Sequence, residues 1–148
     1  MAQIRALANG TIYPCRFVSA YPSSADANGF KVIEDVVAAQ PILGVSQVGT
    51  TGFPMSATND MGVTAPTAAA TTGQELQVFG IGEECLIELG GTVNAGDYLK
   101  ANATTDGKAI KAQLDTAGQQ FVGGQALQYG VAGEKIRMLV APQMIYHA

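Results

Sequence analysis

Charged side chains are scarce in this chain of 148 residues: Asp, Glu, Lys and Arg make up 14% of it, against about 25% in ordinary domains. The eight Lys and Arg residues form no run, and the net charge is −4. Nucleic-acid binding depends on basic residues gathered on one face, so direct binding to nucleic acid is not expected. A surface this neutral suits a protein covered by partners, and it equally suits a plain β fold rich in small residues.

The residues that perform most enzyme chemistry are also few. The single histidine, His147, is the second-last residue, so Ser–His or Cys–His catalysis would depend on a position that usually frays. No GxSxG, HExxH, Walker or GxGxxG motif occurs. Glu83 and Glu84 would face opposite sides of a strand, so we expect carboxylates in solvated turns. The sequence therefore predicts no catalytic residue, no metal site, no cofactor and no enzyme.

Only two cysteines are present, Cys15 and Cys85, which is too few for a disulfide framework. Both lie in strand-like runs, where a free cysteine usually behaves as a small core residue; a bridge between them is the alternative. No apolar run reaches the length of about 18 residues that a membrane span needs, and the N-terminus lacks the pattern of a secretory signal. We expect a soluble protein made in the cytoplasm.

What the chain has instead is repetition. A unit that opens with Gly-Thr and a β-branched residue, turns, and ends on an aromatic and an aliphatic residue occurs at 10–18 and again at 91–99. Three further units recur in order, which predicts two related β modules; chance similarity among β strands is the alternative. The further pairs are 29–33 with 106–110, 41–47 with 121–127, and 82–89 with 133–140.

Strand signals dominate the rest of the chain. Apolar and polar residues alternate at 75–79, 85–89 and 135–140, as in half-buried strands. Turns containing glycine separate such runs at intervals of about 8–12 residues, a spacing typical of barrels and sandwiches. The helical candidates 33–39 and 115–120 are too short for stable amphipathic helices. We therefore predict an all-β fold, a small β-barrel with possible internal duplication and little helix.

The domain organisation predicted from these patterns is an N-terminal arm at 1–8 and a single compact β domain at 9–148. Its two related halves, about 9–48 and 74–141, are joined by the segment 49–73, which is rich in Thr, Ala, Gly and Pro. A stretch of this length without strand signals is usually functional or a linker. It is either a crossover connection or an arm that lies on a neighbouring subunit, with Phe53, Met55 and Met61 as apolar anchors.

The units at 12–18, 41–46, 96–101, 106–109, 122–127 and 133–140 together resemble small bacteriophage head decoration, or capsid cement, proteins. The resemblance covers most of the chain except 49–73, and its motifs also occur in other small β modules. It implies a β-barrel-like or β-tulip fold and no catalysis. It further implies binding to the outer surface of an assembled capsid, often as a trimer, where such proteins bridge neighbouring major capsid protein subunits against internal pressure.

The sequence thus predicts a structural virion protein, made in the host cytoplasm and placed on the outer capsid surface. Its expected partners are the major capsid protein and further copies of itself, with a trimer favoured, and neither nucleic acid nor a membrane. The predicted capsid contacts lie in the arm, for which an ordinary first strand is the alternative. These residues are Ala2, Gln3, Ile4, Arg5 and Leu7.

Two rival functions are weighed against this one. The first is a β-barrel binding module, such as a head fibre or an accessory protein that binds the host or a carbohydrate; clustering of Tyr13, Tyr21, Tyr129 or Tyr146 around a groove would favour it. The second is a small β-clip hydrolase or lyase. A buried carboxylate near a polar pocket would favour the enzyme, and the single terminal histidine argues against it.

Overall fold

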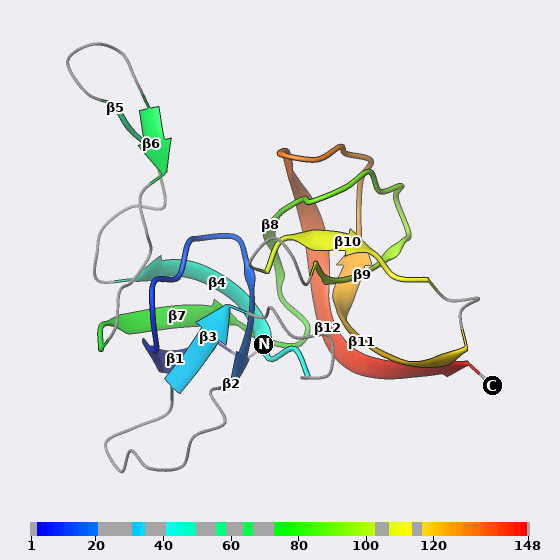
Figure 1. Cartoon of the computed structure of the whole chain (residues 1–148), viewed down its shortest axis with the longest axis horizontal. Coiled ribbons are helices and arrows are strands. Elements are labelled where there is room, and N and C mark those ends of the chain that lie inside the picture. Colours follow the sequence, from blue (N-terminus) through cyan, green and yellow to red (C-terminus); the bar gives the residue numbers. More distant parts are fainter. Residues whose placement is uncertain are drawn as a thin grey trace.

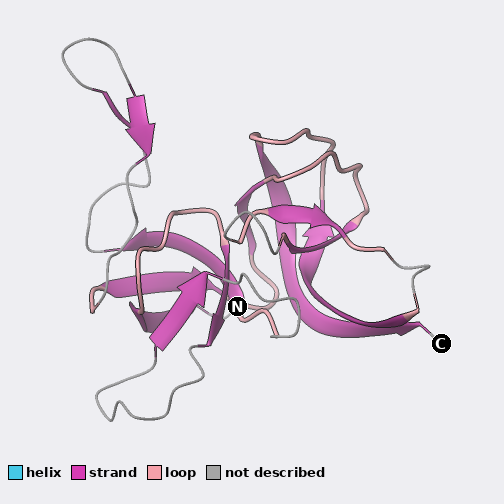
Figure 2. Ribbon diagram, in the orientation of Figure 1, coloured by secondary structure: helices cyan, strands magenta, loops and turns pink. Residues whose placement is uncertain are grey.

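The computed structural model describes residues 3–20, 31–34, 41–49, 56–58, 64–66, 73–102, 107–113 and 117–147. Every regular element in these ranges is a β-strand and none is a helix (Figures 1 and 2), so the predicted all-β class is confirmed. In chain order, the strands are β1 (Gln3–Ala8), β2 (Phe17–Ala20), β3 (Lys31–Glu34), β4 (Gly44–Gly49), β5 (Ser56–Thr58), β6 (Thr64–Pro66), β7 (Glu75–Phe79), β8 (Glu84–Glu88), β9 (Tyr98–Ala101), β10 (Ala109–Lys111), β11 (Gly118–Ala126) and β12 (Lys135–His147).

The first five-stranded sheet closes on itself and forms what we call the first barrel. Its strand order is β1-β3-β2-β4-β7, and β7 returns to pair with β1. Closure removes the unpaired edges that an open sheet would present. Strand alternation sends one set of side chains inward, as in β7, where Leu76 and Val78 are buried between more exposed neighbours. The buried set is Ala6, Ala8, Ile12, Val18, Leu76 and Val78.

The second sheet has the order β10-β9-β11-β12-β8. Its two edge strands meet just beyond β8, where Leu89 forms a parallel bridge with Ala109. The backbone N–H of Gly90 also donates to the carbonyl oxygen of Ala109 at 2.8 Å. The sheet therefore curls around its own core, and we call it the second barrel. Figure 1 shows the two barrels side by side, with the β5–β6 hairpin projecting from the first.

The second barrel repeats the first, strand for strand. Matching β8 with β1, β10 with β3, β9 with β2, β11 with β4 and β12 with β7 reproduces the strand order. The registers match as well. The pair Arg5↔Gln77 corresponds to Leu86↔Arg137, Phe17↔Val45 to Tyr98↔Gln125, and Ala20↔Val32 to Ala101↔Ala109. The parallel contact Ala8↔Val32 corresponds to the bridge Leu89↔Ala109.

Turn hydrogen bonds repeat in the same way. The N–H of Gly73 donates to Ala8 O at 2.9 Å, and that of Gly133 donates to Leu89 O at 2.8 Å. Residues far apart in the sequence thus make the same backbone contacts in both barrels. The internal duplication indicated by the Gly-Thr units is therefore a property of the fold.

The duplication divides the chain at a different place from the one predicted. β7 completes the first barrel, so the halves lie at 3–79 and 84–147 rather than at 9–48 and 74–141. Segment 49–73 connects β4 to β7 within the first barrel and does not join the halves. Of the four predicted pairs, 82–89 with 133–140 is wrong, because these residues form β8 and β12, which pair directly with each other in one barrel.

The predicted N-terminal arm is also a barrel strand over its described part. Residues 3–8 form β1, which pairs with β7 along five residues and with β3 at its end. Ala6 and Ala8 are buried in the first core. Small residues at alternate positions allow this strand to lie close against the barrel interior, so the alternative of an ordinary first strand describes it correctly.

A shared core holds the two barrels together. Phe17 begins β2 of the first barrel, yet its buried ring belongs to the same apolar cluster as the interior of the second. Gly123 makes the space for it, because a Cβ at that position would lie 2.2 Å from Cε1 of the Phe17 ring. The N–H of Phe17 also donates to Gly107 O at 2.8 Å. Phe17 thus fills space that the second barrel leaves open, and Ile42 and Val45 of the first half belong to the same cluster.

Two equivalent glycines offer a matched test of the duplication. A Cβ on Gly44 would lie 2.0 Å from Phe79 O, and one on Gly124 would lie 2.1 Å from Leu139 O. We expect Gly44→Ala and Gly124→Ala each to lower the free energy of unfolding by about 2–3 kcal/mol, measured by urea denaturation. The control is Gly91→Ala, whose Cβ would meet Ile110 at an ordinary 3.6 Å and should change stability by under about 0.5 kcal/mol. If only one of the two glycine substitutions lowers the free energy of unfolding, the two positions are not equivalent.

Candidate functional site

An ion cluster spans the seam between the barrels. Arg16 Nη2 lies 3.0 Å from Glu88 Oε2, and Lys108 Nζ lies 3.4 Å from the same oxygen. The Arg16 and Glu88 side chains are only 12% and 19% exposed. The N–H of Glu88 also donates to Cys15 O at 2.9 Å. Arg16 belongs to the first half and Glu88 and Lys108 to the second, so this cluster bridges the seam between the barrels.

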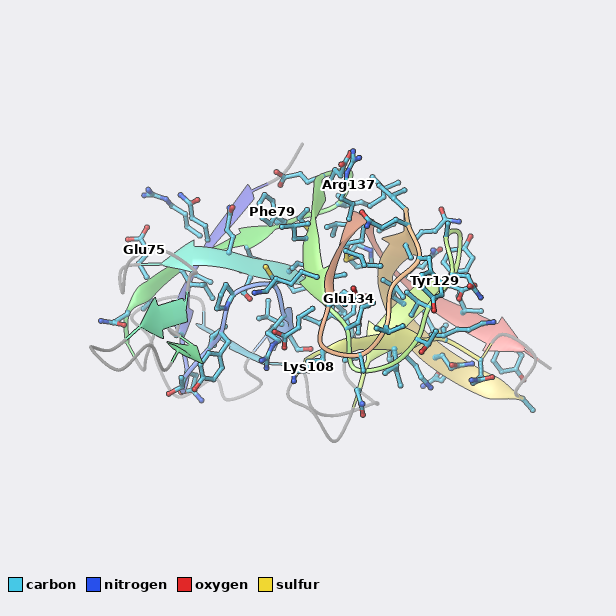
Figure 3. All side chains as sticks on the ribbon, turned by 90° about the horizontal axis from the view of Figure 1, so that it is seen from above. Glu75, Phe79, Lys108, Tyr129, Glu134 and Arg137 are labelled. Atoms are coloured by element: carbon cyan, nitrogen blue, oxygen red, sulfur yellow. The ribbon has the colours of Figure 1, made fainter. Side chains whose placement is uncertain are left out.

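A pocket of about 510 Å³ opens on the same seam. Both barrels line it, and its walls are mainly apolar, with Phe79, Cys85 and Leu86 among them. The Arg137 guanidinium forms an ion pair with the Glu84 carboxylate at its rim, and Figure 3 shows Phe79 and Arg137 on one side of the molecule, away from Lys108. We call this the seam pocket. Its lining residues are Pro14, Cys15, Ser46, Gln47, Phe79, Glu84, Cys85, Leu86 and Arg137.

Cys15 occupies this pocket in a strained backbone conformation. Its φ is 61°, and the equivalent residue of the second barrel is Gly96, with φ of 91°. Left-handed geometry costs a residue with a side chain about 1–2 kcal/mol. Hydrogen bonds from the neighbouring strand hold the turn: the N–H of Cys15 donates to Ser46 O at 3.0 Å, and Ser46 Oγ donates to Tyr13 O at 2.6 Å. The duplicated turn thus carries a thiol in one barrel only.

Both cysteines are free thiols, and the alternative of a disulfide between them is not adopted. Burial raises the pKa of Cys15 above its ordinary 9.0. Burial raises the pKa of Cys85 further, to about 12, and the nearby Cys15, Glu83 and Glu84 add to the effect. Because the thiolate is the nucleophile and the metal-binding form, the raised pKa values favour the neutral thiol, which lines the pocket as a weakly polar group.

The outward faces of the two barrels differ sharply in polarity. On the second barrel, Leu86 of β8 and Leu139 of β12 are 48% and 38% exposed. Leu127 follows β11 on the same side and is also exposed, its N–H bonded to Arg137 O. The position equivalent to Leu86 on the first barrel is Arg5, which lies 3.2 Å from Glu75. Among the described residues of these matched strands, the second barrel exposes leucine where the first exposes a charged residue.

A two-stranded extension distinguishes the second barrel further. β12 pairs with β8 only as far as Leu139, but it stays paired with β11 to His147. A β-bulge between Val122 and Gly124 separates this extension, 118–122 with 143–147, from the barrel; we call it the ribbon. Figure 1 shows it running away from the first barrel to the C-terminal end. Met144 and Tyr146 on the ribbon are 52% and 70% exposed.

Of the residues predicted as functional, those that the structure describes lie on β1 and do not line the seam pocket. Arg5 is exposed and Leu7 half-buried on β1, whereas Gln3 and Ile4 are described as backbone only. Ala2, Phe53, Met55 and Met61 lie outside the described residues.

Leu86 lines the seam pocket but was not predicted, although the alternation of residues in its strand indicates its outward position. Alternation places Cys85 and Ile87 inward, so Leu86 had to face outward between two glutamates.

Two features bear on the rival functions: a buried carboxylate, for the enzyme, and clustered tyrosines, for the binding module. Glu83 was expected in solvent but is buried, and its Oε1 accepts a hydrogen bond from Gly80 N at 3.2 Å; it closes the turn between the barrels. Tyr129 follows β11 and Tyr146 lies near the end of β12, so these two tyrosines lie at opposite ends of one hairpin and do not share a groove. Tyr21 lies outside the described residues. Tyr13 stacks under Arg16, 5.3 Å from its guanidinium carbon.

Within the described ranges, no three His, Cys, Asp or Glu residues gather into a group able to hold a metal ion. Nor does this part of the chain contain a helix whose length and apolar character would let it span a membrane.

No protein-family model and no curated protein sequence matches this chain. Among solved structures, its fold is similar to that of the N base of the head fiber protein gp8.5 of bacteriophage phi29. The TM-score is 0.56 at 14% sequence identity, over 99% of this chain and 98% of the other. The match extends over both barrels, and at this identity it shows a common fold.

The buried thiol of Cys85 predicts a specific dependence of stability on pH. The unfolded chain releases this proton near pH 9.0, whereas the folded protein holds it until about pH 12. Ionisation therefore favours the unfolded chain as pH rises above 9. Between pH 8 and pH 10 the native protein should lose about 1.4 kcal/mol more unfolding free energy than Cys85→Ala, measured by urea denaturation. Equal losses in both proteins would show that the thiol is not held protonated by the fold.

Proposed function

We propose that this protein is a structural component of a bacteriophage head, which binds the outer surface of the capsid and stabilises it by bridging major capsid protein subunits. The observation that carries the proposal is the likeness of the whole fold, both barrels included, to the base of a phage head fiber. Because a fold alone does not assign a function, the proposal also needs support from the surface of the protein.

The surface is consistent with a role in assembly. Its few charges include several that are already paired within the chain, as in Arg5 with Glu75 and Arg137 with Glu84. Exposed leucines lie on the second barrel. Large apolar groups left in water usually mark contact with another protein. The proposed function is therefore binding to other proteins through the surfaces of the two barrels.

A head fibre is the second candidate, and one observation favours it: the structure of similar fold is itself the base of a head fiber. A cement protein bridges subunits throughout the shell, so it should occupy many sites and raise the melting temperature of the capsid. The base of a fibre holds an appendage and need not stabilise the shell. Stoichiometry and capsid stability therefore separate the two functions.

The test is co-sedimentation of the purified protein with expanded, undecorated capsids of the matching phage. The cement function predicts saturable binding at a fixed ratio to the major capsid protein, together with a raised melting temperature of the capsid. Saturable binding without any rise in melting temperature would favour the fibre base. No binding to these capsids would contradict both and direct attention to glycans or the host surface.

The predicted capsid contact on β1 requires a substitution rather than a deletion, because β1 closes the first barrel. Arg5 is exposed on this strand, so Arg5→Glu should leave the fold intact and weaken capsid binding about 10-fold if this face meets the shell. Lys111→Glu, a charge reversal at an exposed position on β10 of the second barrel, is the matched control. Equal effects of the two substitutions would contradict a specific contact at β1.

A further inference from the structure

One face of the ribbon is uncharged and carries three large apolar or aromatic side chains, Phe121, Met144 and Tyr146, beside Gln119. Tyr146 lies opposite Gln119 and Met144 opposite Phe121, and residues opposite one another or two apart share a face of the sheet. Neither of its strands, 118–122 or 143–147, contains Asp, Glu, Lys or Arg. The other face meets the body of the protein, where Gln120 Oε1 accepts hydrogen bonds from Gln113 N and Lys100 Nζ.

The ribbon is not needed to close a barrel. The first barrel has the same five strands, and its β7 ends at Phe79, the counterpart of Leu139. β12 continues for eight residues beyond Leu139, up to His147. Soluble proteins usually protect exposed strands of this kind with lysines or other charges, and a two-stranded ribbon alone is only marginally stable in water. A charge-free ribbon that exposes tyrosine and methionine therefore needs a covering surface.

The seam pocket has the complementary properties. Its volume of about 510 Å³ lies within the range of about 300–1,000 Å³ of pockets that enclose small molecules, so it can admit large side chains such as tyrosine or methionine. Its walls are mainly apolar, and the charges at its rim, Glu84 and Arg137, neutralise each other. An uncharged, apolar side chain can therefore enter the seam pocket without leaving a buried charge unpaired.

Within one molecule the two features cannot meet. Tyr146 lies seven residues beyond Leu139 on the same strand, a separation of about 23 Å along an extended chain. Leu139 pairs with Glu84 at the pocket rim. The ribbon leads away from that rim and from the first barrel (Figure 1). Only a second molecule can bring a ribbon to the pocket.

We propose that the ribbon of one copy, through Met144 and Tyr146, docks into the seam pocket of the next copy. The contact joins two different surfaces of identical chains, so repeating it generates a closed ring when the rotation between copies permits. Each copy then covers both its exposed ribbon and its open pocket. The inference is independent of the capsid role, because the copies would associate in solution with no capsid present.

Sedimentation velocity over a concentration series tests the proposal with the full chain. The native protein should form a discrete oligomer, and Tyr146→Ser and Leu86→Glu should each weaken association at least about 10-fold. Leu86→Glu places a negative charge at the pocket. Tyr129→Ser, which alters another exposed tyrosine (60%, against 70% for Tyr146) at the other end of the same hairpin, is the matched control. Circular dichroism and melting temperature establish that every variant is folded.

Photo-crosslinking identifies the docking site directly. Replacement of Tyr146 by p-benzoylphenylalanine keeps an aromatic group at this position, and irradiation of the oligomer should attach it to the pocket peptides of a second copy, around Cys15 or residues 79–86. A native protein that remains monomeric at millimolar concentration would overturn the proposal. So would crosslinks that join ribbon to ribbon, or association that Tyr146→Ser leaves unchanged. None of these results would bear on binding to capsids.

Discussion

The insertion of Phe17 into the second barrel is the contact on which the rest of the architecture depends. A five-stranded barrel of this size has room for few large side chains, and each half supplies a small apolar set of its own. Phe17, together with Ile42 and Val45, joins the first half to the core of the second barrel, opposite the space left at Gly123, while six other residues form a separate core within the first barrel. The ion cluster of Arg16, Glu88 and Lys108 also bridges the seam, and the seam pocket results from that junction.

Duplication explains why similar backbones carry different surfaces. Strand register is set by the buried faces and the turns, which both halves retain, whereas outward positions are free to differ. Leu86 thus stands where the first barrel has Arg5, and Cys15 stands where the second has Gly96. The apolar surface and the ribbon lie on the second half, and the paired charges of β1 and β7 lie on the first. The two halves therefore present different surfaces on similar backbones.

The all-β class and the repeat were predictable because alternation and glycine turns are local signals, and the Gly-Thr units identify the equivalent β1–β2 and β8–β9 connections. The boundary between halves was not predictable, because β7 lies beyond the long segment 49–73 and only its pairing with β1 and β4 assigns it to the first barrel. The seam pocket depends on residues from five separate stretches. Leu86 was recognisable from alternation in β8, whereas the burial of Glu83 at the turn between barrels was not.

Native-state hydrogen exchange tests most directly whether the two barrels form one cooperative unit. Val18→Ala alters a side chain that belongs to the first core alone. The account predicts that the slowest-exchanging amides of both barrels, such as those of Val78 and Ile87, lose the same opening free energy, about 1–2 kcal/mol, because the shared core makes them unfold together. Loss of protection at Val78 with no change at Ile87 would contradict it and show two barrels that open independently.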